Sequence, residues 1–163
     1  MSNDQQIILE KLNRSLKVCE LHIKRMNHAI SGLTSIFPLS TESFGQLSQD
    51  DIQVIDQFLY RFIKLQDELG NKTFRLLLLC LQEDVENKPF LEILSRLEQL
   101  GIIENEDIWI SLREIRNEIT HEYPEMVMQN ILGLNNLYAH VQDILTIYQK
   151  LLDMAQQYKL LLN

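Results

Sequence analysis

Side chains suited to chemistry on a phosphate group cluster in one short segment of the sequence. Arg113, Arg116 and Asn117 are followed within a few residues by His121 and Tyr123. A guanidinium group presents a planar set of donors that matches a phosphate and can stabilise charge developing on it. An imidazole titrates near neutral pH and can therefore give or take a proton. This segment is the first candidate for a functional site.

Helical geometry sorts these side chains into two directions. Arg113, Asn117 and His121 are spaced four residues apart and share one face of a helix. Arg116 and His121 are five residues apart, which places them about 140° apart on a regular helix. Either the helix distorts before Pro124, or a second subunit brings an arginine and a histidine together. The alternative is a solvent-exposed helix end, where the helix dipole favours both cations.

The remaining histidines do not form a recognisable metal site. His22, His28 and His140 are scattered, and Glu118 with His121 forms one Glu-x-x-His motif. A di-iron site in a helical bundle needs two such motifs, and the sequence contains no second copy. A glycine-rich phosphate loop is absent too. We therefore expect neither a metal nor a cofactor.

The periodicity of apolar residues predicts about five helices that position this segment. Apolar residues recur every three or four positions, as on one face of an amphipathic helix. The expected helices cover residues 4–31, 48–81, 90–100, 104–121 and 124–161, and a loop covers 33–47. Ser48 is the expected N-cap of the second helix, and Gly70 should lie inside that helix without interrupting it. Asn87 is the expected N-cap of the third helix, and Pro89 should lie in its first turn. Short connections favour an all-α, up-and-down antiparallel bundle, with residues 1–163 forming a single domain.

Composition places the chain among ordinary globular proteins. Of its 163 residues 45% are hydrophobic, and only 5 are glycine and 3 are proline. Cys19 and Cys80 form no CxxC pair, and no secretory signal precedes the first helix, so we expect a reduced, cytoplasmic protein. The longest apolar run, residues 76–81, is far shorter than the roughly 20 needed to cross a bilayer. A net charge of −8 opposes general nucleic-acid binding unless cations gather locally.

The segment that contains Arg116 resembles the signature of the HEPN superfamily. Arg116, His121 and Tyr123 have the form Arg-x4-His-x-Tyr, and Asn117 directly after the arginine also fits. The motif resembles in particular that of HepT-like toxins and related nucleotidyltransferase substrate-binding proteins. The all-helical pattern and the place of the motif before a long final helix are similar to that family as well.

The resemblance extends over roughly residues 4–155. Residues 56–62, followed by Glu68, Leu69 and Lys72, resemble the second helix of the family. The extended 32–47 loop departs from its pattern, and Asn71 stands where related proteins often carry an aromatic residue.

The resemblance implies a metal-independent endoribonuclease, the toxin of a type VII-like toxin–antitoxin pair. Arg116, His121 and Asn117 would be catalytic, Arg113 would bind RNA, and RNA cleavage would leave a 2′,3′-cyclic phosphate. The cleft would form between two protomers of a homodimer. The resemblance also implies that a nucleotidyltransferase (MntA-like) antitoxin adenylylates Tyr123, although a half-buried aromatic beside Pro124 is an equally simple interpretation.

Two other functions remain open from the sequence. The chain would be a non-catalytic helical binding subunit of a nucleotidyltransferase if Arg116 and His121 only bind nucleotide or no longer act. It would be an unrelated helical adaptor if these two side chains point to separate solvent-facing surfaces.

Overall fold

The protein folds as a set of helices. A computed structural model describes residues 2–120 and 126–162, and the regular structure within these two ranges is entirely helical, which confirms the predicted all-α class. In chain order the elements are α1 (Asn3–Ser31), α2 (Thr41–Gly45), α3 (Gln49–Glu68), the π-helical turn η1 (Leu69–Thr73), α4 (Phe74–Cys80), α5 (Phe90–Gln99), α6 (Glu106–Thr120) and α7 (Val127–Gln157).

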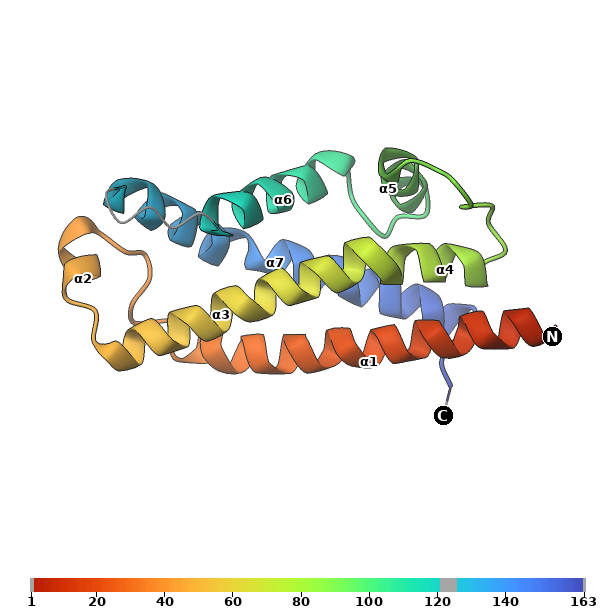
Figure 1. Cartoon of the computed structure of the whole chain (residues 1–163), viewed down its shortest axis with the longest axis horizontal. Helices are drawn as coiled ribbons and strands as arrows, with labels where there is room; N and C mark the ends of the chain where they lie inside the picture. The colour runs from red at the N-terminus through yellow and green to blue at the C-terminus, as the bar shows by residue number, and fades with distance from the viewer. Residues whose placement is uncertain (1, 121–125, 163) are drawn as a thin grey trace.

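The long segments α1, α3–η1–α4, α6 and α7 alternate in direction along the molecule (Figure 1). Helix α1 runs against the continuous segment α3–η1–α4, and α6 runs against α7. Helix α5 departs from this pattern, because it lies across the end of the bundle and is seen end-on in Figure 1. The up-and-down arrangement is therefore found in the long helices, with α5 as a transverse cap beside α4 and α6.

The starts of α1 and α3 follow the local sequence. The side chain of Ser48 accepts a hydrogen bond from the backbone of Asp51, whose carboxylate accepts one from the backbone of Ser48 in return. Ser2 and Gln5 form the same reciprocal arrangement at the start of α1. These pairs satisfy backbone donors that a helix leaves unpaired at its N-terminus, so the prediction for Ser48 is confirmed.

Gly70 lies inside a helical segment that continues from Gln49 to Cys80, as expected, but the segment contains one π-helical turn. A methyl group at Gly70 would lie 3.0 Å from Cζ2 of Trp109 on α6. Glycine therefore allows α6 to approach this turn closely. Such single turns occur often at functional sites.

The predicted start of α5 is wrong at Asn87. The N-cap of α5 is Pro89, and Asn87 has a φ of 59° in the left-handed region, which asparagine tolerates. The guanidinium of Arg75 donates hydrogen bonds to the carbonyls of Val85 (3.0 Å) and Lys88 (2.7 Å). This contact with α4 fixes the loop in a shape that the local sequence does not reveal.

The last helix also ends earlier than predicted. It stops at Gln157 rather than near residue 161. The side chain of Asn13 on α1 donates to the carbonyl of Leu160 (2.8 Å) and accepts from the backbone of Leu162 (2.8 Å). These bonds replace helical ones, so the tail is fastened to α1.

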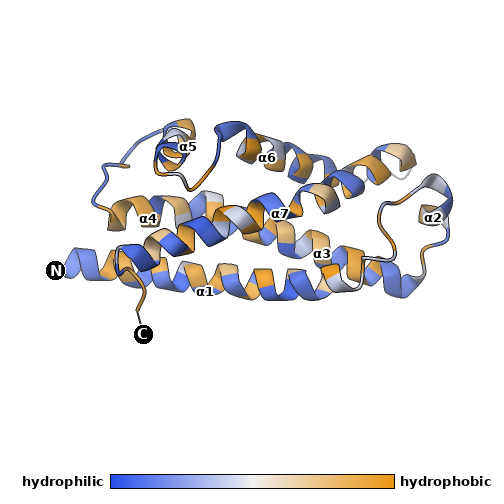
Figure 2. Cartoon of the chain, turned by 180° about the vertical axis from the view of Figure 1, so that it is seen from behind, coloured by the Kyte–Doolittle hydropathy of each residue, from blue (hydrophilic) through white to orange (hydrophobic). Residues whose placement is uncertain are grey.

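The buried side chains form one continuous hydrophobic cluster between the long helices. Trp109, Phe58, Phe62 and Phe74 are among its largest fully buried members. In Figure 2 hydrophobic and hydrophilic residues alternate along each long helix, as expected of helices with one buried face. In the part of the chain that is described, no helix combines the length and hydrophobicity needed to cross a membrane.

Candidate functional site

Three of the sequence-predicted residues lie around one groove between α3–η1–α4 and α6. Arg113, Arg116 and Asn117 all line it. His121 and Tyr123 fall outside the residues that the structure describes. The groove has a volume of about 500 Å³, and we call it the arginine-lined groove. Its polar walls carry Asp67, Asn71, Arg75, Arg113, Arg116 and Asn117.

Arg116 faces the opposite wall of the groove. Its Nη2 atom lies 3.4 Å from Oδ1 of Asp67 on α3, and the two side chains are 34% and 38% exposed. An ion pair this open to solvent contributes only about 0–1 kcal/mol to stability. The guanidinium is thus oriented by Asp67 without being sequestered by it.

The other two arginines of the groove are held differently. Arg113 is exposed and lies over the ring of Phe90, 5.6 Å from its centre. Arg75 is committed to the backbone of the loop before α5. Arg113 therefore remains free to move toward a ligand, whereas Arg75 supplies a fixed positive charge.

Gln66 and Trp109 are the buried residues among those that line the groove, and we call them its floor. Gln66 is only 4% exposed, and its Nε2 and Oε1 form no hydrogen bond within the described residues. The same holds for the indole Nε1 of Trp109, which is 1% exposed. Leaving a buried polar group unpaired costs roughly 1–3 kcal/mol. Sequence reasoning missed both residues, although a glutamine between Phe62 and Leu69 on an apolar helix face was a usable signal.

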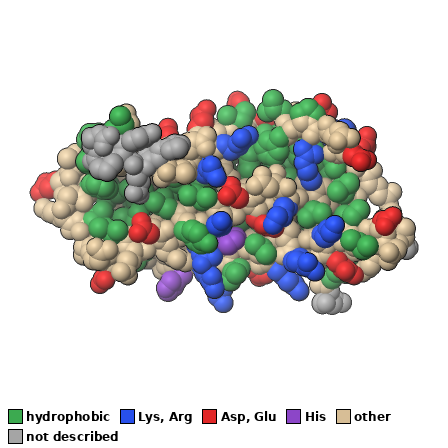
Figure 3. Space-filling view, in the orientation of Figure 1, with side chains coloured by type: hydrophobic (Ala, Val, Ile, Leu, Met, Phe, Trp, Pro, Cys, Tyr) green, Lys and Arg blue, Asp and Glu red, His purple; other side chains and the backbone are tan. Residues whose placement is uncertain are grey.

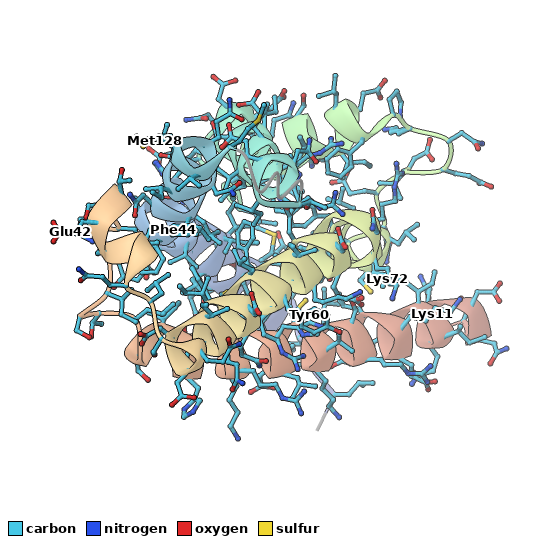
Figure 4. All side chains as sticks on the ribbon, turned by 60° about the vertical axis from the view of Figure 1, so that its left-hand side comes forward. Lys11, Glu42, Phe44, Tyr60, Lys72 and Met128 are labelled. Atoms are coloured by element: carbon cyan, nitrogen blue, oxygen red, sulfur yellow. The ribbon has the colours of Figure 1, made fainter. Side chains whose placement is uncertain are left out.

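A second groove with basic walls adjoins the first. It is lined by Lys11 and Arg14 of α1 and by Lys72 of η1, and it shares Asn71 and Arg75 with the arginine-lined groove. Figure 3 shows Lys and Arg side chains gathered across the middle of the face formed by α1, α3–α4 and α6. Figure 4 shows Lys72 on the side of its helix that faces α1 and Lys11. The two grooves meet at Asn71 and Arg75, and we call the surface that they form together the basic strip.

The histidines at positions 22, 28 and 140 do not line the arginine-lined groove. Nδ1 of His22 lies 3.1 Å from Nη1 of Arg61 on α3. Burial, and then the neighbouring guanidinium, lower the pKa of His22 below its ordinary value. His140 pairs with Asp143 on the exposed side of α7. None of these three histidines is therefore a candidate for chemistry in this groove.

Within the described ranges no group of three or more His, Cys, Asp or Glu side chains is placed to hold a metal ion. Cys19 and Cys80 are free thiols, and burial raises the pKa of Cys19 to about 12 and that of Cys80 to about 11. Both thiols therefore remain protonated at neutral pH and are poor nucleophiles.

The fold and the groove define the class of protein as an all-α helical bundle with a cationic, arginine-lined groove. Comparisons with protein-family models, with curated proteins and with solved structures found no match.

Proposed function

We propose that the protein is a HEPN-type, metal-independent endoribonuclease, the toxin of a type VII-like toxin–antitoxin pair, and that it cleaves RNA at a composite site in a homodimer. The observation that carries the proposal is the convergence of Arg75, Arg113, Arg116 and Asn117 on one open groove. This arrangement supports a shared role for the arginines in binding phosphate. The motif that begins at Arg116 supplies the reaction type.

In the proposed reaction the 2′-hydroxyl of a ribose attacks the adjacent phosphorus. A bond forms between the 2′-oxygen and phosphorus, and the bond from phosphorus to the 5′-oxygen breaks. His121 takes the hydroxyl proton or delivers one to the departing oxygen, and the second protomer supplies the complementary group. Arg116 stabilises the charge that develops on the phosphate. The products are a 2′,3′-cyclic phosphate and a free 5′-hydroxyl.

The basic strip answers the objection raised by the net charge of −8. Binding to RNA depends on the cations that meet its phosphates, and the charge elsewhere on the protein matters less because salt screens it over about 10 Å. Lys11, Arg14 and Lys72 extend the cationic surface from the arginine-lined groove across α1. Glu68 offsets part of this charge through its 2.9 Å ion pair with Lys72. An RNA strand can therefore follow one face of an acidic protein.

Cleavage of a short RNA by the purified full-length chain in the presence of EDTA tests the proposal. We expect cyclic phosphate ends by mass spectrometry, and a rate at least about 100-fold lower for Arg116→Ala, the loss typical of one transition-state donor. His121→Ala should be inactive, and Arg116→Lys should stay impaired because it lacks the planar fork. Arg25→Ala, at an exposed position of α1 away from the groove, is the matched control.

Absence of cleavage by the wild-type dimer would overturn the ribonuclease proposal. If the inactive chain also co-purifies with a nucleotidyltransferase, the non-catalytic binding subunit becomes the better description. If the chain cleaves RNA and the nucleotidyltransferase abolishes this by adding AMP to Tyr123, the toxin–antitoxin proposal is supported in full.

A further inference from the structure

Three of the four buried side-chain atoms that lack a hydrogen-bond partner in the described part of the chain belong to residues that line the arginine-lined groove. They are Nε2 and Oε1 of Gln66 and Nε1 of Trp109. Buried polar atoms in proteins are almost always paired, so a cluster of exceptions needs an explanation. A ligand that enters the groove and meets these atoms would supply one.

The chemistry of the three atoms defines what they can recognise. The amide of Gln66 offers an acceptor beside a donor, and the indole of Trp109 offers one further donor. A nucleobase edge carries the complementary pair, a donor next to an acceptor, and glutamine pairs with such an edge through two hydrogen bonds. Inorganic phosphate has no flat edge with a donor beside an acceptor, so it would bind mainly to the arginines and could not form this two-bond pairing with the amide.

The surrounding residues suit the rest of a nucleotide. Arg113 and Arg116 lie on the α6 wall of the same groove, and both are accessible to a phosphate. The volume of about 500 Å³ falls within the range of small-molecule sites. Gly70 leaves no side chain between the π-helical turn and Trp109, whose ring lies directly against it. Cationic walls above a polar, unpaired floor thus match a phosphate and a base.

We propose that Gln66 and Trp109 form a nucleobase-binding subsite in the floor of the arginine-lined groove, which holds one nucleotide by its base edge and its phosphate. The inference rests on the proposed function for its choice of ligand, RNA, and adds the residues that would give cleavage a base preference. Arg113 and Asn117, whose side chains are exposed, line the same groove and would lie beside the bound nucleotide.

The protein carries its own reporter for this test. Trp109 is the single tryptophan of the chain, so its emission reports on the groove alone. We would titrate the full-length protein with AMP, GMP, CMP and UMP, and with ribose 5-phosphate and inorganic phosphate as ligands that lack a base. We expect at least one nucleotide to bind 10-fold or more tightly than ribose 5-phosphate and to shift the emission of Trp109.

Substitution of Gln66 assigns the preference to its amide. Gln66→Met keeps the length of the side chain without its hydrogen-bonding groups, and calorimetric titration should show the nucleotide binding no more tightly than ribose 5-phosphate. Gln53→Met, at an exposed position of the same helix, is the matched control and should bind as the wild type does. Gln66→Asn keeps the amide but withdraws it by one methylene, so it should alter the preference among bases. This variant provides the test if Gln66→Met fails to fold.

The subsite is overturned if no nucleotide binds more tightly than ribose 5-phosphate, or if both Gln66 variants keep the base preference of the wild type. These results are independent of catalysis. RNA cleavage without any base preference would support the ribonuclease proposal and contradict the subsite. Nucleotide binding that depends on Gln66, without cleavage, would support the subsite and contradict the ribonuclease proposal.

Discussion

Gly70→Ala tests the close packing that forms the floor of the arginine-lined groove. The added methyl group would lie 3.0 Å from Cζ2 of Trp109, closer than the 3.5–4.0 Å at which carbon atoms normally meet. The indole cannot easily retreat, because it is 1% exposed and its ring packs edge-on against Phe74 with 4.7 Å between centroids. The ring of Phe90 is also close, with a centroid distance of 6.4 Å to the indole.

Two opposing effects set the size of the change. Alanine is favoured over glycine inside a helix by about 1 kcal/mol, and this gain is an upper limit in a π-helical turn. Overpacking of a well-filled core costs about 1–3 kcal/mol. We therefore expect a net loss of about 1 kcal/mol in the free energy of unfolding, which lowers the Tm by roughly 2–4 °C in a chain of this length.

Urea unfolding with a double-mutant cycle separates the two effects. Trp109→Phe removes the part of the indole that Cζ2 belongs to, so Gly70→Ala should be neutral or stabilising in that background. Gly45→Ala is the matched control, because a methyl group at Gly45 meets nothing within 4 Å. The packing argument fails if Gly70→Ala stabilises the wild type, or if it costs as much beside Trp109→Phe as beside tryptophan.

Three further predictions concern other contacts of the bundle. Asn13→Ala should cost about 1–3 kcal/mol and expose the C-terminal tail to proteases, because it removes the bonds that fasten the tail to α1; limited proteolysis followed by mass spectrometry tests this. His22 should titrate below its ordinary pKa in an NMR experiment, and Arg61→Gln should raise that pKa. The imidazole of His22 binds a proton more readily in the unfolded chain than in the folded one. His22 should therefore make the protein more stable as the pH rises from its lowered pKa to about 6.5. If the free energy of unfolding depends on pH in the same way in His22→Gln, this prediction is wrong. Cys80, half-buried, should react with a thiol reagent at pH 8 slowly but before fully buried Cys19, whereas equal rates in the native state would refute the burial argument.

The sequence was sufficient where local chemistry determines the structure. The apolar periodicity located the long helices, and the Ser48 cap followed from serine and acidic residues in the first turn. It was insufficient at Asn87, where a long-range contact from Arg75 shapes the loop, and at the end of α7, where Asn13 draws the tail away. Both errors arise because a distant side chain replaces the local hydrogen bonds.

The candidate site divides in the same way. One wall was predictable, because Arg113, Arg116 and Asn117 are three and four residues apart and share one face of α6. The opposite wall and the floor were not predictable, because their distance from this wall depends on how α3 packs against α6. Gln66 was visible only as a glutamine at an apolar position, and Trp109 was indistinguishable from any other core aromatic residue.

The π-helical turn explains why Arg75 lines the same groove as Gln66. Nine residues separate them, and a regular α-helix would place them about 180° apart, on opposite faces. A π-helical turn accommodates one extra residue, so the effective separation is eight residues, or about 80°. Both side chains can then line the groove, as the structure shows. The irregularity around Gly70 therefore does two things at once: it brings a third arginine to the groove and lets Trp109 close its floor.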